Sequence, residues 1–197
     1  VLEESLRDKK DPSSLTASYF EKHGGTYGFS TTEKAYYELQ LKEMISFFSL
    51  QEQILTELFS HFQPKYFEQE IRFSVLGHSF FAKVDRIDCD ANGNVLIYDY
   101  KTGNVSFSPN QIVSGDNFQA LLYWLAAEHF IKENKLRGNC VGVLFYDFKK
   151  KEVRRGLARA EALSSVAAKH LTRGHSLTEE KLRQTIEQGL LQIERIT

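Results

Sequence analysis

Two carboxylates and a lysine on neighbouring predicted strands form the most informative pattern in the sequence. Residues 79–89 and 94–101 alternate apolar and polar side chains, which is typical of β-strands, and a short Asn-Gly turn between them favours a hairpin. Side chains two apart in a strand share a face, so Asp99 and Lys101 should project together. The hairpin should bring Asp85 to a similar level.

This arrangement predicts a site for a hard divalent cation. Mg²⁺ and Mn²⁺ take oxygen ligands and keep several waters. A bound cation lowers the pKa of such a water and neutralises charge on a phosphate. Lys101 would orient or deprotonate the water, or stabilise charge on the phosphate. The alternative is a hairpin with charged residues along its solvent face, because Asp-x-Lys triplets are common.

A longer motif around these residues favours the metal site over the solvent-exposed hairpin. The run Ile-Tyr-Asp-Tyr-Lys-Thr-Gly at 97–103 follows Asp-Arg-Ile-Asp at 85–88. This pattern resembles the PD-(D/E)xK superfamily, specifically nuclease domains of the RecB and AddB type. The similarity covers 77–126 and continues more weakly to about residue 148. It implies a restriction-endonuclease-like α/β fold, with a mixed central sheet flanked by helices.

The resemblance also implies roles for individual residues. By this resemblance, Asp85 and Asp99 would bind the metal, and the backbone carbonyl of Tyr100 would be a further ligand. Lys101 would be the catalytic lysine. The family usually adds an acidic residue or a histidine from an upstream helix. Glu70, which opens the strand before the hairpin, is our choice for this ligand, with His23 and Glu38 as alternatives.

A predicted amphipathic helix at about 111–133 carries a second part of the resemblance. Gln119 and Tyr123 are four apart and therefore lie on one helix face. The similar nucleases have a Gln and a Tyr with this spacing after their lysine. Gln119 could bond to a catalytic group or to the DNA backbone, and Tyr123 could close the site. Without that context the spacing indicates only an amphipathic helix. Trp124 is expected in the core.

A basic run follows at 149–159. Lys150, Lys151 and Arg155 in this run are candidates for contacts to nucleic-acid phosphates. The alternative is a solvated hairpin edge, which lysines often protect.

The periodicity of apolar residues predicts the elements that position these groups. Residues 1–32 are expected to be a connector with a short helix at most, and 33–197 the nuclease domain. Within the domain we expect one or two helices over 33–62, strands at 70–76, 79–89 and 94–101, a helix at 111–133, strands at 141–148 and 152–157, and helices at 161–170 and 178–196.

Composition narrows the class of protein. The 197 residues are 42% hydrophobic and 26% charged, with a net charge of -1, which excludes a wholly basic nucleic-acid-binding surface but not a basic groove. No apolar run reaches the roughly 18–20 residues that span a bilayer. The only cysteines, Cys89 and Cys140, indicate a reducing, cytoplasmic location and no iron–sulfur cluster within this chain.

The sequence therefore predicts a Mg²⁺- or Mn²⁺-dependent deoxyribonuclease that acts in DNA repair or recombination. The resemblance implies single-stranded DNA ends delivered by a helicase module in the same polypeptide or complex, and no membrane. The chain begins at Val1 and is expected to be part of a longer helicase–nuclease-like protein, and a poor nuclease without it. The alternative is a DNA-binding or scaffolding domain that kept the fold and lost catalysis.

Overall fold

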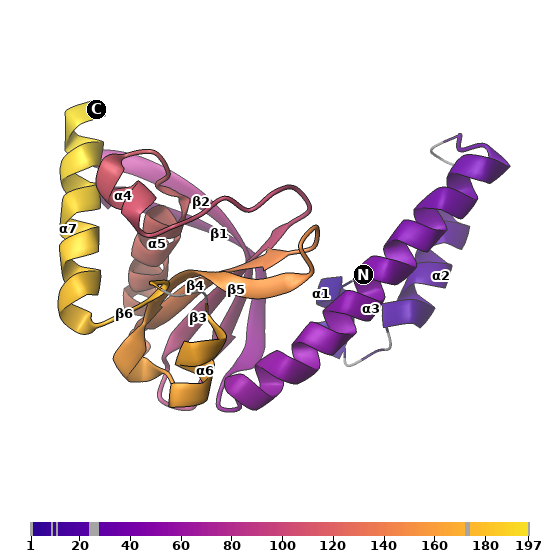
Figure 1. Cartoon of the computed structure of the whole chain (residues 1–197), viewed down its shortest axis with the longest axis horizontal. Helices are drawn as coiled ribbons and strands as arrows, with labels where there is room; N and C mark the ends of the chain where they lie inside the picture. Colours follow the sequence, from indigo (N-terminus) through magenta and orange to yellow (C-terminus); the bar gives the residue numbers. More distant parts are fainter. Residues whose placement is uncertain (1, 9, 11, 24–27, 172–173, 197) are drawn as a thin grey trace. The chain divides into compact units, whose positions relative to one another are not determined.

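The computed structural model describes residues 2–8, 10, 12–23, 28–171 and 174–196. The chain divides into two compact units, residues 1–57 and 58–197. The first unit contains the helices α1 (Leu2–Asp8), α2 (Pro12–His23) and α3 (Thr31–Leu58), as Figure 1 shows. None of the described helices is both long enough and apolar enough to cross a membrane.

The N-terminal unit is more helical than the sequence indicated. Its first 32 residues include α1 and α2, whereas we expected a short helix at most. Pro12 begins α2, a position that suits its fixed φ and missing N–H. A capping box precedes α3, in which the Glu33 carboxylate accepts from Ser30 N at 2.9 Å and Ser30 Oγ accepts from Glu33 N at 3.3 Å. The expected boundary at 32/33 does not coincide with the division at 57/58.

The second unit contains a six-stranded mixed sheet (Figure 1). Its strands, in sheet order, are β1 (Gln63–Val75), β2 (His78–Cys89), β3 (Val95–Lys101), β4 (Cys140–Asp147), β5 (Glu152–Arg159) and β6 (Ser176–Leu177). The pairs β3–β4 and β5–β6 are parallel, and the other pairs are antiparallel. The mixed sheet confirms the expected fold class. The sequence did not predict β6, whose two residues carry no alternation.

The helices of this unit flank the sheet. They are α4 (Asn110–Ser114), α5 (Gln119–Glu133), α6 (Ser165–His170) and α7 (Glu179–Ile196), with a 3₁₀ turn at Ala160–Ala162. The single helix expected at 111–133 is interrupted because Gly115 adopts φ 84°, which ends α4. The side chain of Asn117 then accepts a hydrogen bond from Gln119 N at 3.0 Å, which fixes the start of α5.

The core lies between α5 and one face of the sheet. Val95 and Ile97 of β3 are fully buried in the same cluster as Trp124 of α5, which confirms the expected core position of this tryptophan. Strand alternation then places Asp99, the next residue in that phase, at the end of the buried face. The fold thereby brings a carboxylate to the edge of an apolar core.

Candidate active site

Asp85 and Asp99 lie where β2 and β3 diverge. The paired positions of these strands run from Cys89–Val95 to Arg86–Tyr98. One residue beyond the last pair, the Asp85 carboxylate accepts a hydrogen bond from the backbone N–H of Tyr100 at 2.7 Å. A side chain thus continues the contact between the strands after their backbone pairing ends, and it fixes Asp85 beside Asp99.

Asp99 is a buried anion with an incomplete set of partners. Its side chain is 4% exposed, and the Lys101 ammonium lies 2.8 Å from Oδ2. This contact is an ion pair only, because Oδ2 accepts no well-directed hydrogen bond in the described part of the chain. Burial raises the pKa of Asp99, Lys101 opposes that rise, and the charge of Asp85 adds to it. A further cation at this position would stabilise the ionised carboxylate.

Helix α5 supplies two polar groups to Asp99. The Gln119 amide donates to Asp99 Oδ1 at 3.5 Å and to the Tyr123 hydroxyl at 3.3 Å. Tyr123 in turn donates to the backbone carbonyl of Lys83 at 3.1 Å. Burial, with the nearby charge of Asp99, raises the pKa of Tyr123, which keeps its hydroxyl protonated as a donor. The structure therefore brings Gln119 and Tyr123 to the two aspartates and Lys101.

No described contact joins Glu70, the predicted upstream ligand, to this group. Glu70 is exposed on β1, and it alternates with Ile71 and Phe73, whose side chains lie in the core. The described residues hold no group of three or more His, Cys, Asp or Glu side chains placed to bind a metal. Metal ligation by Glu70 and by the Tyr100 carbonyl therefore both stay predictions.

The two alternatives to Glu70 belong to the N-terminal unit. Glu38 is a partly exposed residue of α3, and the side chain of His23 lies outside the described residues.

The donor set nevertheless fits a hard cation. Asp85 and Asp99 offer carboxylate oxygens, which Mg²⁺ and Mn²⁺ prefer. Within the described residues, the buried Asp99 Oδ2 has the Lys101 ammonium as its charged partner but accepts no well-directed hydrogen bond. With two side-chain ligands, water or substrate oxygens would complete the coordination, which is how Mg²⁺ is commonly held.

Sequence reasoning missed the role of two further residues of the Asp-Arg-Ile-Asp motif. Arg86 donates from Nε and Nη2 to the two Asp88 carboxylate oxygens, each at 2.6 Å, and both side chains are 3% exposed. The guanidinium also lies 4.6 Å from the centre of the Tyr98 ring. The sequence feature that could have revealed this pair is the spacing of two opposite charges two residues apart in a strand, which places both side chains on one face. This buried pair stiffens β2 directly beside Asp85.

The basic run at 149–159 covers the turn after β4 and the whole of β5. Lys150 Nζ donates to the carbonyl of Val105 at 2.9 Å, and Arg155 Nε lies 3.1 Å from the carboxylate of Glu152. Lys151 adopts a left-handed backbone, with φ 54°. Lys150 and Arg155 therefore already have partners within the protein, and a phosphate would have to compete with them.

Comparisons with known proteins agree with this geometry. Residues 2–196 match the family model of the PD-(D/E)XK nuclease superfamily. The chain is also 28% identical over 193 residues to an ATP-dependent helicase/deoxyribonuclease subunit of Carboxydothermus hydrogenoformans. That alignment covers 87% of this chain but 18% of the relative, so the chain spans less than a fifth of that protein's length. Because the family model matches nearly every residue of a chain with a flanked mixed sheet, this chain belongs to the PD-(D/E)XK nuclease superfamily.

Proposed function

We propose that this nuclease-superfamily domain hydrolyses phosphodiester bonds in DNA with the help of Mg²⁺ or Mn²⁺. The observation that carries the proposal is the buried Asp99 carboxylate, which lies beside Asp85 and 2.8 Å from the Lys101 ammonium. An apolar core does not favour such an anion, so the arrangement needs a chemical reason. A hard cation bound by the two carboxylates is that reason.

Each residue of the site would have a separate role in the reaction. A bound divalent cation supplies an activated water and neutralises phosphate charge. The Lys101 ammonium has three donors, so it can contact Asp99 and a phosphate oxygen at once. Gln119 holds the orientation of the Asp99 carboxylate through its amide. Tyr123 fixes α5 against β2 through the Lys83 carbonyl and covers the site on that side.

The substrate would be single-stranded DNA ends. The similar protein from Carboxydothermus is named as both helicase and deoxyribonuclease, and this chain matches a small part of it. We therefore propose that a helicase module in the same polypeptide or complex delivers the strand, and that the protein acts in DNA repair or recombination.

Single-turnover cleavage of a labelled single-stranded oligonucleotide tests the proposal. Lys101→Ala should lower the rate about 10²–10³-fold, the usual effect of removing one group that stabilises transition-state charge. EDTA should abolish cleavage. Lys181→Ala is the matched control, because Lys181 is an exposed lysine on α7. An undiminished rate for Lys101→Ala, with the native circular dichroism spectrum, would exclude Lys101 from catalysis.

One observation favours the alternative of a catalytically degenerate DNA-binding or scaffolding domain. Only two carboxylates are grouped at the site within the described residues. This alternative predicts DNA binding without cleavage at any Mg²⁺ or Mn²⁺ concentration. Calorimetric titration with each metal, on the native chain and on Asp99→Asn, would show whether the two carboxylates bind a cation at all.

A further inference from the structure

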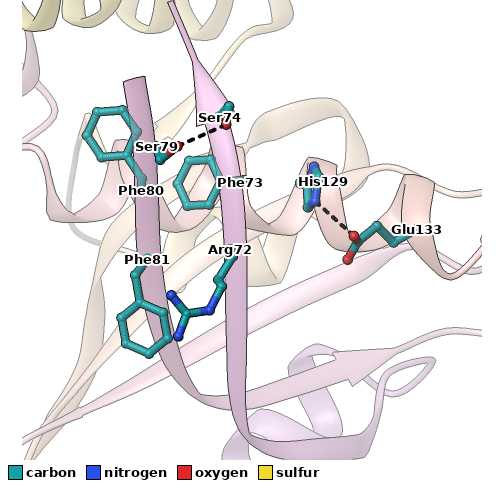
Figure 2. A pocket seen from close by; sticks show the side chains of 8 residues that line it. All are labelled: Arg72, Phe73, Ser74, Ser79, Phe80, Phe81, His129 and Glu133. Atoms are coloured by element: carbon teal, nitrogen blue, oxygen red, sulfur yellow. Dashed lines mark hydrogen bonds and ion pairs between the residues drawn. The ribbon is translucent and has the colours of Figure 1, made fainter. Parts of the chain in front are cut away.

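A pocket of about 630 Å³ lies where the β1–β2 hairpin meets the second half of α5. Figure 2 shows side chains from both hairpin strands on one side and His129 with Glu133 of α5 on the other. Asp85, Asp99 and Lys101 do not line it. The pocket is therefore separate from the candidate active site, although the same strand and the same helix contribute to both.

The most distinctive pair in this pocket is Arg72 and Phe81, which face each other across β1 and β2. The Phe81 ring is 52% exposed, and the Arg72 guanidinium lies 5.1 Å from its centre (Figure 2). In the described part of the chain, no carboxylate lies within ion-pairing distance of Arg72. An exposed ring with a guanidinium beside it offers a flat stacking surface and a positive charge to a flat anionic ligand.

The inner part of the pocket is also aromatic. Phe73 and Phe80 stack with ring centres 5.7 Å apart and planes inclined by 23°. The His129 ring lies 6.4 Å from that of Phe73, and its Nε2 lies 3.2 Å from the Glu133 carboxylate. Phe73 is buried in the core and Phe80 is half-buried against it, so the ring most open to a ligand is that of Phe81, with the Arg72 guanidinium beside it.

This chemistry suits unpaired nucleobases and their phosphates. Bases in single strands stack on aromatic side chains irrespective of sequence, and arginine adds cation–π and phosphate contacts. We propose that the Arg72–Phe81 pocket binds the single strand of a nucleic acid beside the active site. The inference rests on the proposed function, since it supplies the strand on which that site would act.

The pocket and the candidate active site share a strand. Phe81 precedes Asp85 by four residues on β2, which is about 13 Å along a strand. A nucleic-acid strand covers that distance in about four nucleotides at helical spacing, and in fewer when stretched. The basic run at 149–159 is a weaker candidate for this role, because Lys150 and Arg155 are engaged within the protein.

Fluorescence anisotropy with a labelled single-stranded oligonucleotide, in EDTA to prevent cleavage, tests the inference on the whole chain. Phe81→Ala should weaken binding about 5- to 150-fold, the effect of losing stacking on one base, and should leave the salt dependence unchanged. Arg72→Ala should weaken binding and lower the slope of log K against log salt by about 0.7. Val166→Ala and Arg183→Ala are matched controls, because both residues are exposed and lie outside the pocket.

A blunt duplex separates stacking from general attraction. Its bases are paired, so Phe81→Ala should leave duplex binding unchanged. An equal loss on both substrates, no loss on the single strand, or no measurable single-strand binding by the native chain would each overturn the inference. If Phe81→Ala has no effect on any nucleic acid, the exposed ring belongs to a protein interface instead.

The proposed function can fail independently. Hydrolysis of bis(p-nitrophenyl) phosphate tests the metal site alone, because this small diester cannot extend to Phe81. Suppose that Lys101→Ala loses this hydrolysis while Phe81→Ala binds the single strand as the native chain does. This result would refute only the proposed role of the pocket. Single-strand binding that depends on Phe81, without any metal-dependent hydrolysis, would refute the nuclease proposal only.

Discussion

Replacing Arg86 with methionine should leave a buried carboxylate without its counter-ion. Arg86 makes two hydrogen bonds of 2.6 Å to Asp88, and water reaches neither side chain appreciably. Removing one partner of such a pair costs about 3–5 kcal/mol. Methionine retains much of the aliphatic length, so the loss reports the charge more than a cavity. We expect the free energy of unfolding of Arg86→Met to fall by about 3–5 kcal/mol at pH 8.

The dependence on pH supplies a second check. Burial raises the pKa of Asp88 above its usual 3.8, and the positive charge of Arg86 opposes this rise. Removing Arg86 therefore raises the pKa further. The folded variant then binds a proton more tightly than the unfolded chain, so its stability falls as the pH rises through that window. The penalty relative to the native sequence should be smaller at pH 5 than at pH 8.

Urea unfolding followed by tryptophan fluorescence measures both effects. Trp124 is the only tryptophan of the chain and is fully buried, so its emission reports the unit that contains the site. Arg86→Met combined with Asp88→Leu should recover most of the loss, since apolar side chains often replace a buried pair without penalty. A double variant as unstable as the single one, or a penalty that is constant from pH 5 to pH 8, would refute the reasoning.

Three further predictions concern stability and reactivity. Asp147 is buried, its Oδ1 accepts from Lys150 N at 2.8 Å, and its Oδ2 has no hydrogen-bond partner among the residues that the structure describes. Asp147→Asn should keep the bond to Lys150 N and be neutral or stabilising by up to about 1 kcal/mol in urea unfolding, whereas Asp147→Ala should destabilise. Gly189→Ala should destabilise by about 1–3 kcal/mol despite the better helix propensity of alanine, because its Cβ would lie 2.5 Å from Leu121 Cδ2; a gain in melting temperature would contradict this. Burial raises the pKa of the Cys140 thiol, so a thiol reagent at pH 8 should label this thiol only after unfolding. Fast labelling of Cys140 in the native chain would show that the structure around this thiol opens.

Local spacing explains why the sequence could predict that Asp99, Lys101, Gln119 and Tyr123 lie together. Alternation in a strand placed Asp99 and Lys101 on one face, and helical spacing placed Gln119 and Tyr123 on another. These rules need only neighbours in the chain. The apolar periodicity likewise predicted most strands, and Trp124 was expected in the core, which the structure confirms.

Contacts between distant segments could not be predicted in this way. Nothing in the local pattern indicated that the Asp85 side chain would bind the Tyr100 amide, or that Lys150 would donate to Val105. The break before α5 was visible only as Gly115, whose positive φ matters once the chain has to turn there. The proposed Arg72–Phe81 pocket was equally hidden, because strand register, rather than composition, sets those two side chains side by side.

The parallel pairing of β3 with β4 has a consequence for how the site assembles during folding. Hairpin contacts between β2 and β3 close a short loop, which is fast, whereas β4 can pair with β3 only after the long crossover through α5 has been ordered. The two aspartates would therefore meet early, while they are still hydrated and their mutual repulsion is screened by water. Docking of α5 then removes that water late. On this order, the two aspartates would lose their water at the last stage of folding, through the element that also delivers Gln119 and Tyr123.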